Sequence, residues 1–244
     1  MLIFWGTTKK GLVRKFNEDC ISTEHAPLFV LADGMGGYKG GEIASSLAVN
    51  VTQTWLQKNH AGGPITEERM RQAVFVANTA ILREKEKMPD LSGMGTTLAA
   101  AYFSQNRLIW ASVGDSRIYL YHEGRLAQLT KDHSFVMDLL DKGFITHEEA
   151  QDHPRKNELT RAVGIASSLT VDTGTSAADE GDLVLLCSDG LSSYVEDAQI
   201  REIIAGGIYD TVSGMKKITE DLLAKVYETG AKDNVSIILA SYVR

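Results

Sequence analysis

Short apolar runs recur along the chain, and polar turn residues separate them. The runs are rich in β-branched, aromatic and aliphatic side chains, which is typical of buried strands. Gly, Asn and Asp lie between them, as expected at turns. The pattern predicts strands over 2–8, 28–32, 95–104, 107–113, 117–122, 182–187 and 235–243. The short connections 104–107 and 122–125 look like tight turns, so we predict one antiparallel meander over 95–130.

A different spacing, with apolar residues three and four positions apart, predicts helices. Two such helices follow each other and are expected to pair. A third helix near the C-terminus would end at Gly230, and a fourth, shorter one covers about 197–206. The apolar faces are Ile43, Ala44, Leu47, Ala48, Val51 and Trp55; Met70, Ala73, Val74, Ala77 and Ile81; and Val212, Met215, Ile218, Leu222 and Val226.

Residues 132–164 show short helical pieces in place of either long pattern. Thr146 and Glu149 have the spacing of a capping box, in which each side chain bonds the other residue's backbone N–H. We expect this region to be an inserted flap. Since the helices gather in pairs and do not alternate with the strands, the pattern favours a layered α+β domain over a doubly wound sheet.

Composition narrows the class of protein. The 244 residues are 43% hydrophobic, enough for a sizeable core, and no Pro- or Ser-rich linker divides them, so we predict a single domain over 1–244. The net charge of −7 argues against a protein that binds nucleic acid or anionic membranes through bulk charge.

No stretch approaches the roughly 20 apolar residues of a membrane span. The first residues lack the features of a signal peptide. Cys20 and Cys187 form no close-spaced pair, as expected for free thiols in a reducing compartment. We therefore predict a cytoplasmic protein, acting as a monomer and binding neither nucleic acid nor membrane.

Four aspartates lie at the ends of apolar runs. Asp33, Asp115 and Asp189 each follow such a run, and Asp233 precedes one. Each could be a turn residue that accepts hydrogen bonds from backbone amides. Carboxylates at the mouths of neighbouring strands would instead concentrate negative charge, which is costly unless a cation neutralises it. Together the four predict a site for a divalent metal.

Two further segments carry candidate chemistry. Arg14 stands close to Glu18 and Asp19. Its guanidinium could hold two phosphate oxygens, although the segment taken alone is more typical of a charged surface loop. The glycine-rich loop 33–42 lets backbone approach a ligand, with Asp33 and the Gly34 carbonyl as hard oxygen donors. It lacks the Gly-Lys-Ser/Thr of a nucleotide-binding P-loop.

The motifs and their order along the chain resemble those of the metal-dependent protein phosphatases of type 2C, in their compact bacterial form. The resemblance covers essentially the whole chain. It rests on Arg14 with 17–19, and on 33–37, 95–97, 114–117, 159–164, 188–190 and 233–234.

The resemblance implies a four-layer sandwich of two antiparallel sheets flanked by helix pairs, with a binuclear metal site at one end. Asp33 would bridge two ions, the Gly34 carbonyl would bind one, and Asp189 and Asp233 would complete the other. A third, weaker ion is implied beside Asp115 and Asp189. The residues expected to act through water or by supporting the ligands are Glu18, Asp19 and Asn234.

All-oxygen ligation suits Mn²⁺ or Mg²⁺ and suits zinc or copper poorly. A hydroxide bridging two such ions would attack phosphorus directly, without a phosphoenzyme, at a catalytic centre that includes Asp33 and Asp189. Arg14 would bind the substrate phosphate and stabilise its developing charge.

The leaving group poses a separate question. Some family members have a His after the Asp-Gly pair, where this chain has Met35. Metal-bound water, or His133 or His153 from the flap, would then protonate the leaving oxygen. An isolated histidine in a polar segment is, however, more often a solvated surface residue.

Three rival functions differ in what they require of the sequence. A cysteine-based phosphatase needs an Arg six positions after its Cys, but Ser193 follows Cys187 at that distance and Ala26 follows Cys20. A catalytically weak phosphoprotein-binding or regulatory module of the same fold remains an alternative, as does a phosphatase dedicated to one regulator. The favoured prediction is a serine/threonine protein phosphatase that acts on phosphorylated proteins and opposes a Ser/Thr kinase.

Overall fold

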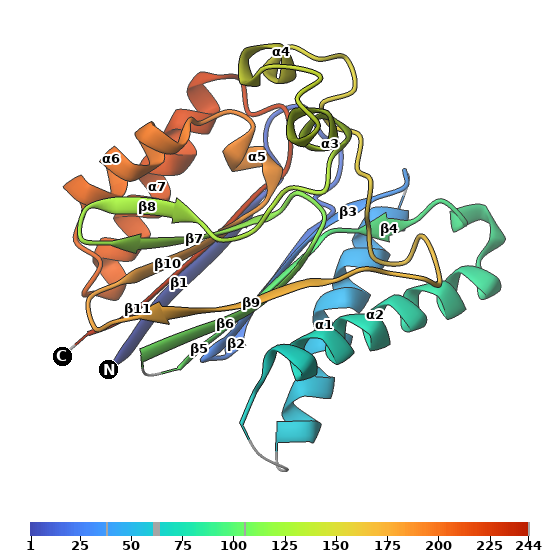
Figure 1. Cartoon of the computed structure of the whole chain (residues 1–244), viewed down its shortest axis with the longest axis horizontal. Coiled ribbons are helices and arrows are strands. Elements are labelled where there is room, and N and C mark those ends of the chain that lie inside the picture. The colour runs from blue at the N-terminus through green and yellow to red at the C-terminus, as the bar shows by residue number, and fades with distance from the viewer. Residues whose placement is uncertain (38, 61–63, 105, 244) are drawn as a thin grey trace.

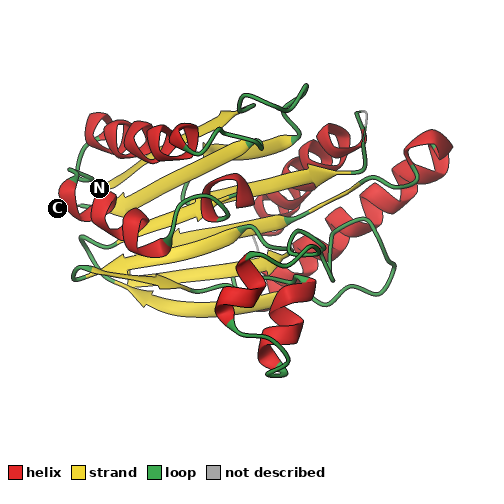
Figure 2. Cartoon of the chain, turned by 90° about the horizontal axis from the view of Figure 1, so that it is seen from above, coloured by secondary structure: helices red, strands yellow, loops and turns green. Residues whose placement is uncertain are grey.

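The chain folds into four layers, with two sheets face to face and helices covering both outer faces (Figures 1 and 2). The computed structural model describes residues 1–37, 39–60, 64–104 and 106–243. The two ends of the chain lie close together, because Leu2 in the first strand pairs with Tyr242 in the last. The α+β sandwich expected from the resemblance is confirmed.

The first sheet has the order β2-β3-β5-β6-β9, and a short strand, β4, pairs with β3. All its described pairings are antiparallel. Its strands are β2 (Asp19–His25), β3 (Leu28–Met35), β4 (Gly95–Thr96), β5 (Leu98–Ser104), β6 (Asn106–Val113) and β9 (Asp172–Ala178).

The second sheet has the order β1-β11-β10-β7-β8 and is also antiparallel. Its strands are β1 (Leu2–Lys9), β7 (Arg117–His122), β8 (Arg125–Gln128), β10 (Leu183–Cys187) and β11 (Val235–Tyr242).

The helices lie outside the sheets, with α1 and α2 packed together on the first sheet and α6 and α7 on the second. Thr66 caps α2 by accepting a hydrogen bond from the Arg69 N–H, and acidic and basic residues occupy its first and last turns, as the helix dipole favours. The helices are α1 (Gly40–His60), α2 (Glu67–Lys87), η1 (Pro89–Leu91), α3 (Phe135–Asp141), α4 (His147–Gln151), α5 (Asp189–Ser192), α6 (Asp197–Gly206) and α7 (Val212–Glu228).

Strand periodicity produces three apolar layers from two sheets. In β3, Val30 and Ala32 face α1 and α2, whereas Phe29 and Leu31 face the other sheet. Alternate residues of a strand point to opposite faces, so one apolar run serves two cores. The third core lies between the second sheet and α5, α6 and α7.

The flap contains α3 and α4, which lie at one end of the sandwich (Figure 1). The capping box of Thr146 and Glu149 is confirmed, with both reciprocal hydrogen bonds present. The segment returns to the body at Val163, which bridges to Thr96 of β4.

Two strand predictions were wrong. The predicted 95–130 meander is two hairpins in different sheets, since β6 pairs with β5 and β9 whereas β7 pairs with β8 and β10. Residue 105, in the predicted 104–107 connection, lies outside the described residues. The single strand predicted over 95–104 is divided at Thr97, and β2 and β9 were not predicted.

Candidate active site

A cavity of about 520 Å³ opens at the end of the sandwich where β3, β10 and the flap meet. It gathers most of the candidate site residues, although they come from segments far apart in the sequence. Its lining is Arg14, Glu18, Asp33, Gly34, Met35, Gly36, Gly37, Thr97, Asp115, Asn157, Glu158, Leu159, Thr160, Arg161, Ala162, Ile165, Asp189, Asp233 and Asn234. Residue 38, in the predicted glycine-rich loop, lies outside the described residues.

Asp33 is fixed by hydroxyl groups from other strands. Its backbone N–H donates to Thr97 Oγ1 at 2.9 Å, and that oxygen shares a 2.7 Å hydrogen bond with the Ser116 hydroxyl. The Thr96 hydroxyl donates to the Asp33 carbonyl at 2.8 Å. The break between β4 and β5 therefore brings two threonines to the end of β3, where they hold Asp33 at the cavity.

Asp19 lies behind the cavity, paired across the strands with Asp33. The hydroxyls of Ser188 and Ser236 donate to its Oδ2 at 2.9 and 2.6 Å. It is buried and does not line the cavity wall. Ser188 immediately precedes Asp189, so the same contact joins β2 to the segment carrying a second candidate ligand.

Close backbone approaches explain two glycines of the site. A Cβ on Gly34 would lie 2.1 Å from the Gly41 carbonyl oxygen. A Cβ on Gly190 would lie 1.8 Å from the Asn234 carbonyl oxygen. Both distances are shorter than any Cβ tolerates, so glycine allows these segments to approach each other and bring the carboxylates together.

The gathered carboxylates perturb one another's titration. Burial raises the pKa of Asp33 well above its ordinary value, and the Asp19, Asp189 and Asp115 carboxylates raise it further. Burial also raises the pKa of Asp19 to about 7 and that of Asp189 to about 6. The pKa of Asp115 is raised by burial, then by Asp189 and Asp132. Positive charge from Arg14 near Asp189 and from Arg117 near Asp115 offsets these shifts only in part.

Three oxygens identify what this arrangement can bind. Glu18 Oε1, Asp19 Oδ1 and Asp189 Oδ1 are buried and accept no hydrogen bond. Unpaired buried acceptors are costly in a folded protein. A cation with several oxygen ligands would satisfy them, and an all-oxygen set of carboxylates fits Mn²⁺ or Mg²⁺. The residues present thus fit a divalent metal centre.

Arg14 provides positive charge at the cavity. Its Nη2 donates to Asp233 Oδ2 at 2.7 Å, and half of the side chain, 51%, is exposed. Asn234 fixes the backbone on either side of Arg14. Its Oδ1 accepts from the Glu18 N–H, and its Nδ2 donates to the Lys10 and Phe16 carbonyls. A guanidinium that is anchored at one nitrogen and half exposed can also contact a phosphate.

The flap wall contributes Arg161, to which the sequence analysis gave no role. Its Nη1 donates to Asp172 Oδ1 at 3.0 Å, so the first residue of β9 holds a flap cation beside the cavity. Asp172 had no recognisable signal because its strand was not predicted. Arg161 lies within the motif 159–164, so that motif was the sequence feature that could have identified it as a site residue.

The structure does not bring His133 or His153 to the cavity. His133 is 3% exposed; its Nδ1 accepts from the Gly114 N–H and its Nε2 lies 3.1 Å from Asp172 Oδ2. Since Nδ1 is an acceptor, the Nε2 proton goes to Asp172, and burial lowers the pKa of His133. His153 accepts from the Arg155 N–H and packs on the Phe135 ring. Both have structural partners, and for His133 these include the cavity residue Arg161, whose Nη1 lies 3.2 Å from His133 Nε2.

Cys187 is a core residue, as predicted. It is fully buried among the apolar residues under the second sheet, and burial raises the pKa of its thiol to about 12. A thiol with that pKa is not a nucleophile at neutral pH.

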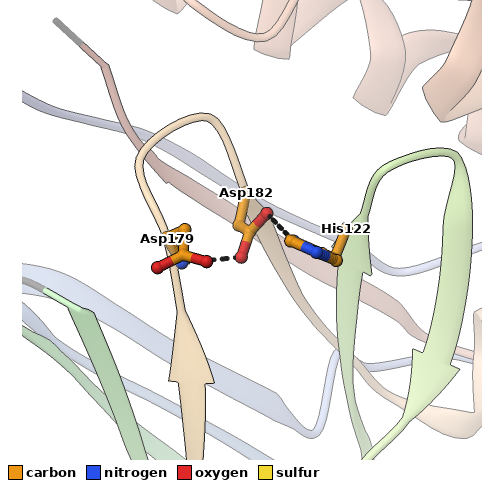
Figure 3. A group of neighbouring side chains, drawn as sticks. All are labelled: His122, Asp179 and Asp182. Carbon is orange, nitrogen blue, oxygen red and sulfur yellow. Dashed lines mark hydrogen bonds and ion pairs between the residues drawn. The ribbon is translucent and has the colours of Figure 1, made fainter.

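A separate group, His122, Asp179 and Asp182, lies at the other end of β10 (Figure 3). Asp182 Oδ1 lies 2.7 Å from His122 Nδ1, and Asp182 Oδ2 accepts from the Asp179 backbone N–H at 2.7 Å. These contacts join the β7–β8 and β9–β10 connections. They use both oxygens of the buried carboxylate, so the group is explained as a structural tie.

Known proteins share both the sequence and the fold. The family model for protein phosphatase 2C matches residues 13–236. The serine/threonine phosphatase stp of Listeria monocytogenes is 36% identical over 95% of this chain and 92% of its own length. The serine/threonine protein phosphatase PstP of Mycobacterium tuberculosis is 39% identical over 100% of this chain, which matches 45% of that protein.

Solved structures of serine/threonine phosphatases share the fold of this chain. The M. tuberculosis PstP/Ppp structure has a TM-score of 0.90 at 38% identity and covers 100% of this chain, which covers 99% of it. The PstP catalytic domain in complex with two manganese ions gives 0.88 at 37% identity, with coverage of 100% and 99%. Among the described residues, no helix is long and apolar enough to cross a membrane.

Proposed function

Because the chain belongs to the protein phosphatase 2C family, we propose that its cavity hydrolyses phosphoserine and phosphothreonine in proteins by direct attack of water. The chain is a metal-dependent serine/threonine protein phosphatase. The observation that carries the proposal for its site is the set of buried, unpaired carboxylate oxygens on Glu18 and Asp189, which line the cavity, and on Asp19 behind it.

Asp33, the Gly34 carbonyl, Asp189 and Asp233 would hold two divalent cations, and Asp115 with Asp189 would hold a weaker third. Either Mn²⁺ or Mg²⁺ suits these donors. When bound, such ions supply Lewis acidity toward the phosphoryl oxygens and lower the pKa of water, so that a nucleophile forms near neutral pH. Glu18 at the cavity wall and Asp19 behind it add negative charge, and Asn234 holds the surrounding backbone.

Protein groups perform the remaining tasks. Arg14 takes phosphoryl oxygens on one side of the cavity, while Arg161, oriented by Asp172, adds positive charge on the flap side. Both stabilise the charge that spreads over the phosphoryl oxygens as the ester bond breaks. Among the described residues that line the cavity there is no histidine, so solvent within the cavity supplies the proton to the leaving serine or threonine oxygen.

The cellular setting follows from the same activity. Substrates are phosphorylated proteins, and a Ser/Thr kinase supplies the phosphate that this enzyme removes. We place the enzyme in the cytoplasm, since Cys20 and Cys187 are free thiols. We expect it to act as a monomer because the cavity is assembled from one chain.

Hydrolysis of a phosphothreonine peptide tests the proposal. The purified protein would be assayed with Mn²⁺, with Mg²⁺ and with chelator, beside Asp189→Asn and a control, Asp210→Asn, whose exposed carboxylate lies outside the cavity. We expect metal-dependent phosphate release that Asp189→Asn removes and Asp210→Asn retains. A folded wild-type protein that released no phosphate with either metal would refute catalysis and favour a phosphoprotein-binding module.

A further inference from the structure

The segment 9–16, here called the rim segment, joins β1 to β2 at the cavity end of the sandwich (Figure 1). It displays apolar side chains to solvent on both sides of Arg14. Leu12 is 66% exposed, Val13 65% and Phe16 49%. Single exposed apolar residues are common, but three within five residues form a patch of the kind that marks a binding surface.

The rim segment is also basic. It contains Lys9, Lys10, Arg14 and Lys15 and no carboxylate, within a chain of net charge −7. All four cations are exposed, and of these four only Arg14 has an ion pair with a described residue. A surface that combines uncompensated positive charge with apolar groups complements an anionic polypeptide that carries apolar side chains.

Backbone hydrogen bonds hold the rim segment in place. The Leu12 N–H donates to the Ala231 carbonyl at 2.8 Å. The buried Asn234 amide donates to the carbonyls of Lys10 and Phe16 at 2.9 and 3.0 Å, which clamps the segment near both ends. Its apolar side chains are therefore presented on a fixed backbone, which lowers the entropy cost of binding.

The patch adjoins the catalytic cavity along the chain. Arg14 lines the cavity, and Leu12 and Phe16 each lie two residues away, within about 7.6 Å along the backbone. Two residues of an extended substrate span a similar distance, at about 3.3–3.6 Å each. A phosphoresidue held at Arg14 thus has its sequence neighbours within reach of the rim segment.

We infer that the rim segment is a substrate-docking surface that recognises apolar residues beside the phosphoserine or phosphothreonine of a polypeptide. This inference deepens the proposed function and rests on it. Leu12, Val13 and Phe16 select the neighbouring side chains, while the lysines attract the anionic substrate. Free phosphate esters that lack a polypeptide do not reach this surface.

The test compares three substrates under saturating Mn²⁺. Two phosphothreonine peptides of equal length and charge carry either Leu and Val or Ser and Gly on both sides of the phosphothreonine, and the third substrate is an aryl phosphate. The variant is Leu12→Ser with Val13→Ser. The matched control is Ile208→Ser with Val212→Ser, which changes two residues of similar exposure, 64% and 50%, in and beside the α6–α7 connection.

We expect wild type to prefer the apolar peptide by about tenfold in kcat/KM, mainly through KM. The rim variant should lose most of this preference, so that its ratio of apolar-peptide to aryl-phosphate kcat/KM falls about tenfold. The control should keep both the preference and the ratio.

Equal wild-type rates on the two peptides, or a preference that survives in the rim variant, would overturn the docking surface while leaving the phosphatase intact. Activity on neither peptide by a folded wild-type protein would remove the proposed function and the inference together. Light scattering of both proteins adds a further outcome. A wild-type dimer that the rim substitutions dissociate, with peptide preference unchanged, would assign the patch to a second copy and refute substrate docking.

Discussion

Each candidate aspartate has a different environment at the cavity, and these environments predict different losses on substitution. Burial raises the pKa of both Asp33 and Asp189, and nearby carboxylates, including Asp233 near Asp189, raise it further. Burial and the Asp189 and Asp132 carboxylates raise the pKa of Asp115, and the Arg117 guanidinium partly offsets this rise. Asp189 has a buried oxygen without a hydrogen-bond partner, and among the described residues Asp115 has none, so we expect Asp115 to contribute less than Asp189 to binding the main metal ions.

Asp189→Asn should abolish binding of at least one of the two main Mn²⁺ ions and lower kcat by about 10³-fold, since it removes a charged ligand while preserving shape. Asp115→Asn should keep both ions and lower kcat by about 10- to 100-fold through the proposed third site. Titration calorimetry with Mn²⁺, beside steady-state kinetics, checks both. An Asp189→Asn protein with full metal binding and turnover would contradict the ligand assignment.

Arg14 provides a second residue-scale prediction. Arg14→Lys keeps the charge but loses the fork geometry, so it should raise KM for a phosphopeptide about tenfold with a smaller change in kcat. Lys232→Ala is the control, because Lys232 is an exposed cation beside Asp233 and does not line the cavity. Unchanged kinetic constants in Arg14→Lys would remove its bidentate role.

At the scale of elements, the sequence pattern identified the buried strands and the long helices, and it failed at strands that expose a polar face. β2 and β9 are the two edge strands of the first sheet. Both are rich in polar residues, as in Asp-Thr-Gly-Thr-Ser for 172–176. Edge strands tolerate such residues because one side faces solvent, so their apolar signal is weak.

The local sequence pattern also could not show which strands pair with each other. β6 and β7 both alternate correctly, but the turn at Gly114, Asp115 and Ser116 carries the chain from one sheet to the other. The four candidate aspartates, in contrast, could be picked out from the sequence because each adjoins an apolar run. The Thr97 hydroxyl that fixes Asp33 is 64 residues away, and no local pattern specifies that contact.

The anchoring of the flap on α2 permits an element-scale prediction. Asn78, 2% exposed, accepts from the Gly164 N–H at 2.6 Å and donates to the Ala166 carbonyl at 2.9 Å. Asn78→Ala leaves both backbone groups unpaired, so we expect a loss of about 1–3 kcal/mol in unfolding free energy and a raised peptide KM. Urea denaturation measures the first effect.

Asn50→Ala on α1 is the matched control, because Asn50 is exposed and its amide donates only to the Ser46 hydroxyl among its described contacts. We expect its unfolding free energy to stay within about 0.5 kcal/mol of wild type. Equal stability of the two variants would mean that the Asn78 contacts do not anchor the flap.

At the scale of the whole molecule, the carboxylate cluster links folding to both pH and metal. Burial raises the pKa of Asp19 to about 7 and that of Asp189 to about 6, from an ordinary value near 3.8. A carboxyl with a raised pKa in the folded state binds more protons there than in the unfolded chain. Without metal, its stabilising contribution is present at low pH and is lost as pH rises through about 6 to 7.

Bound Mn²⁺ competes with these protons, so its stabilising effect should grow over the same interval. We expect the difference in unfolding free energy between saturating Mn²⁺ and chelator to widen from pH 5.5 to pH 7.5. The slope should be about 1.4 kcal/mol per pH unit for each proton displaced. Taking the difference cancels groups away from the site, including His122, whose pKa is raised beside Asp182. Denaturant titrations at matched ionic strength provide the measurement. Parallel curves with and without Mn²⁺ would show that these carboxylates do not exchange protons for metal.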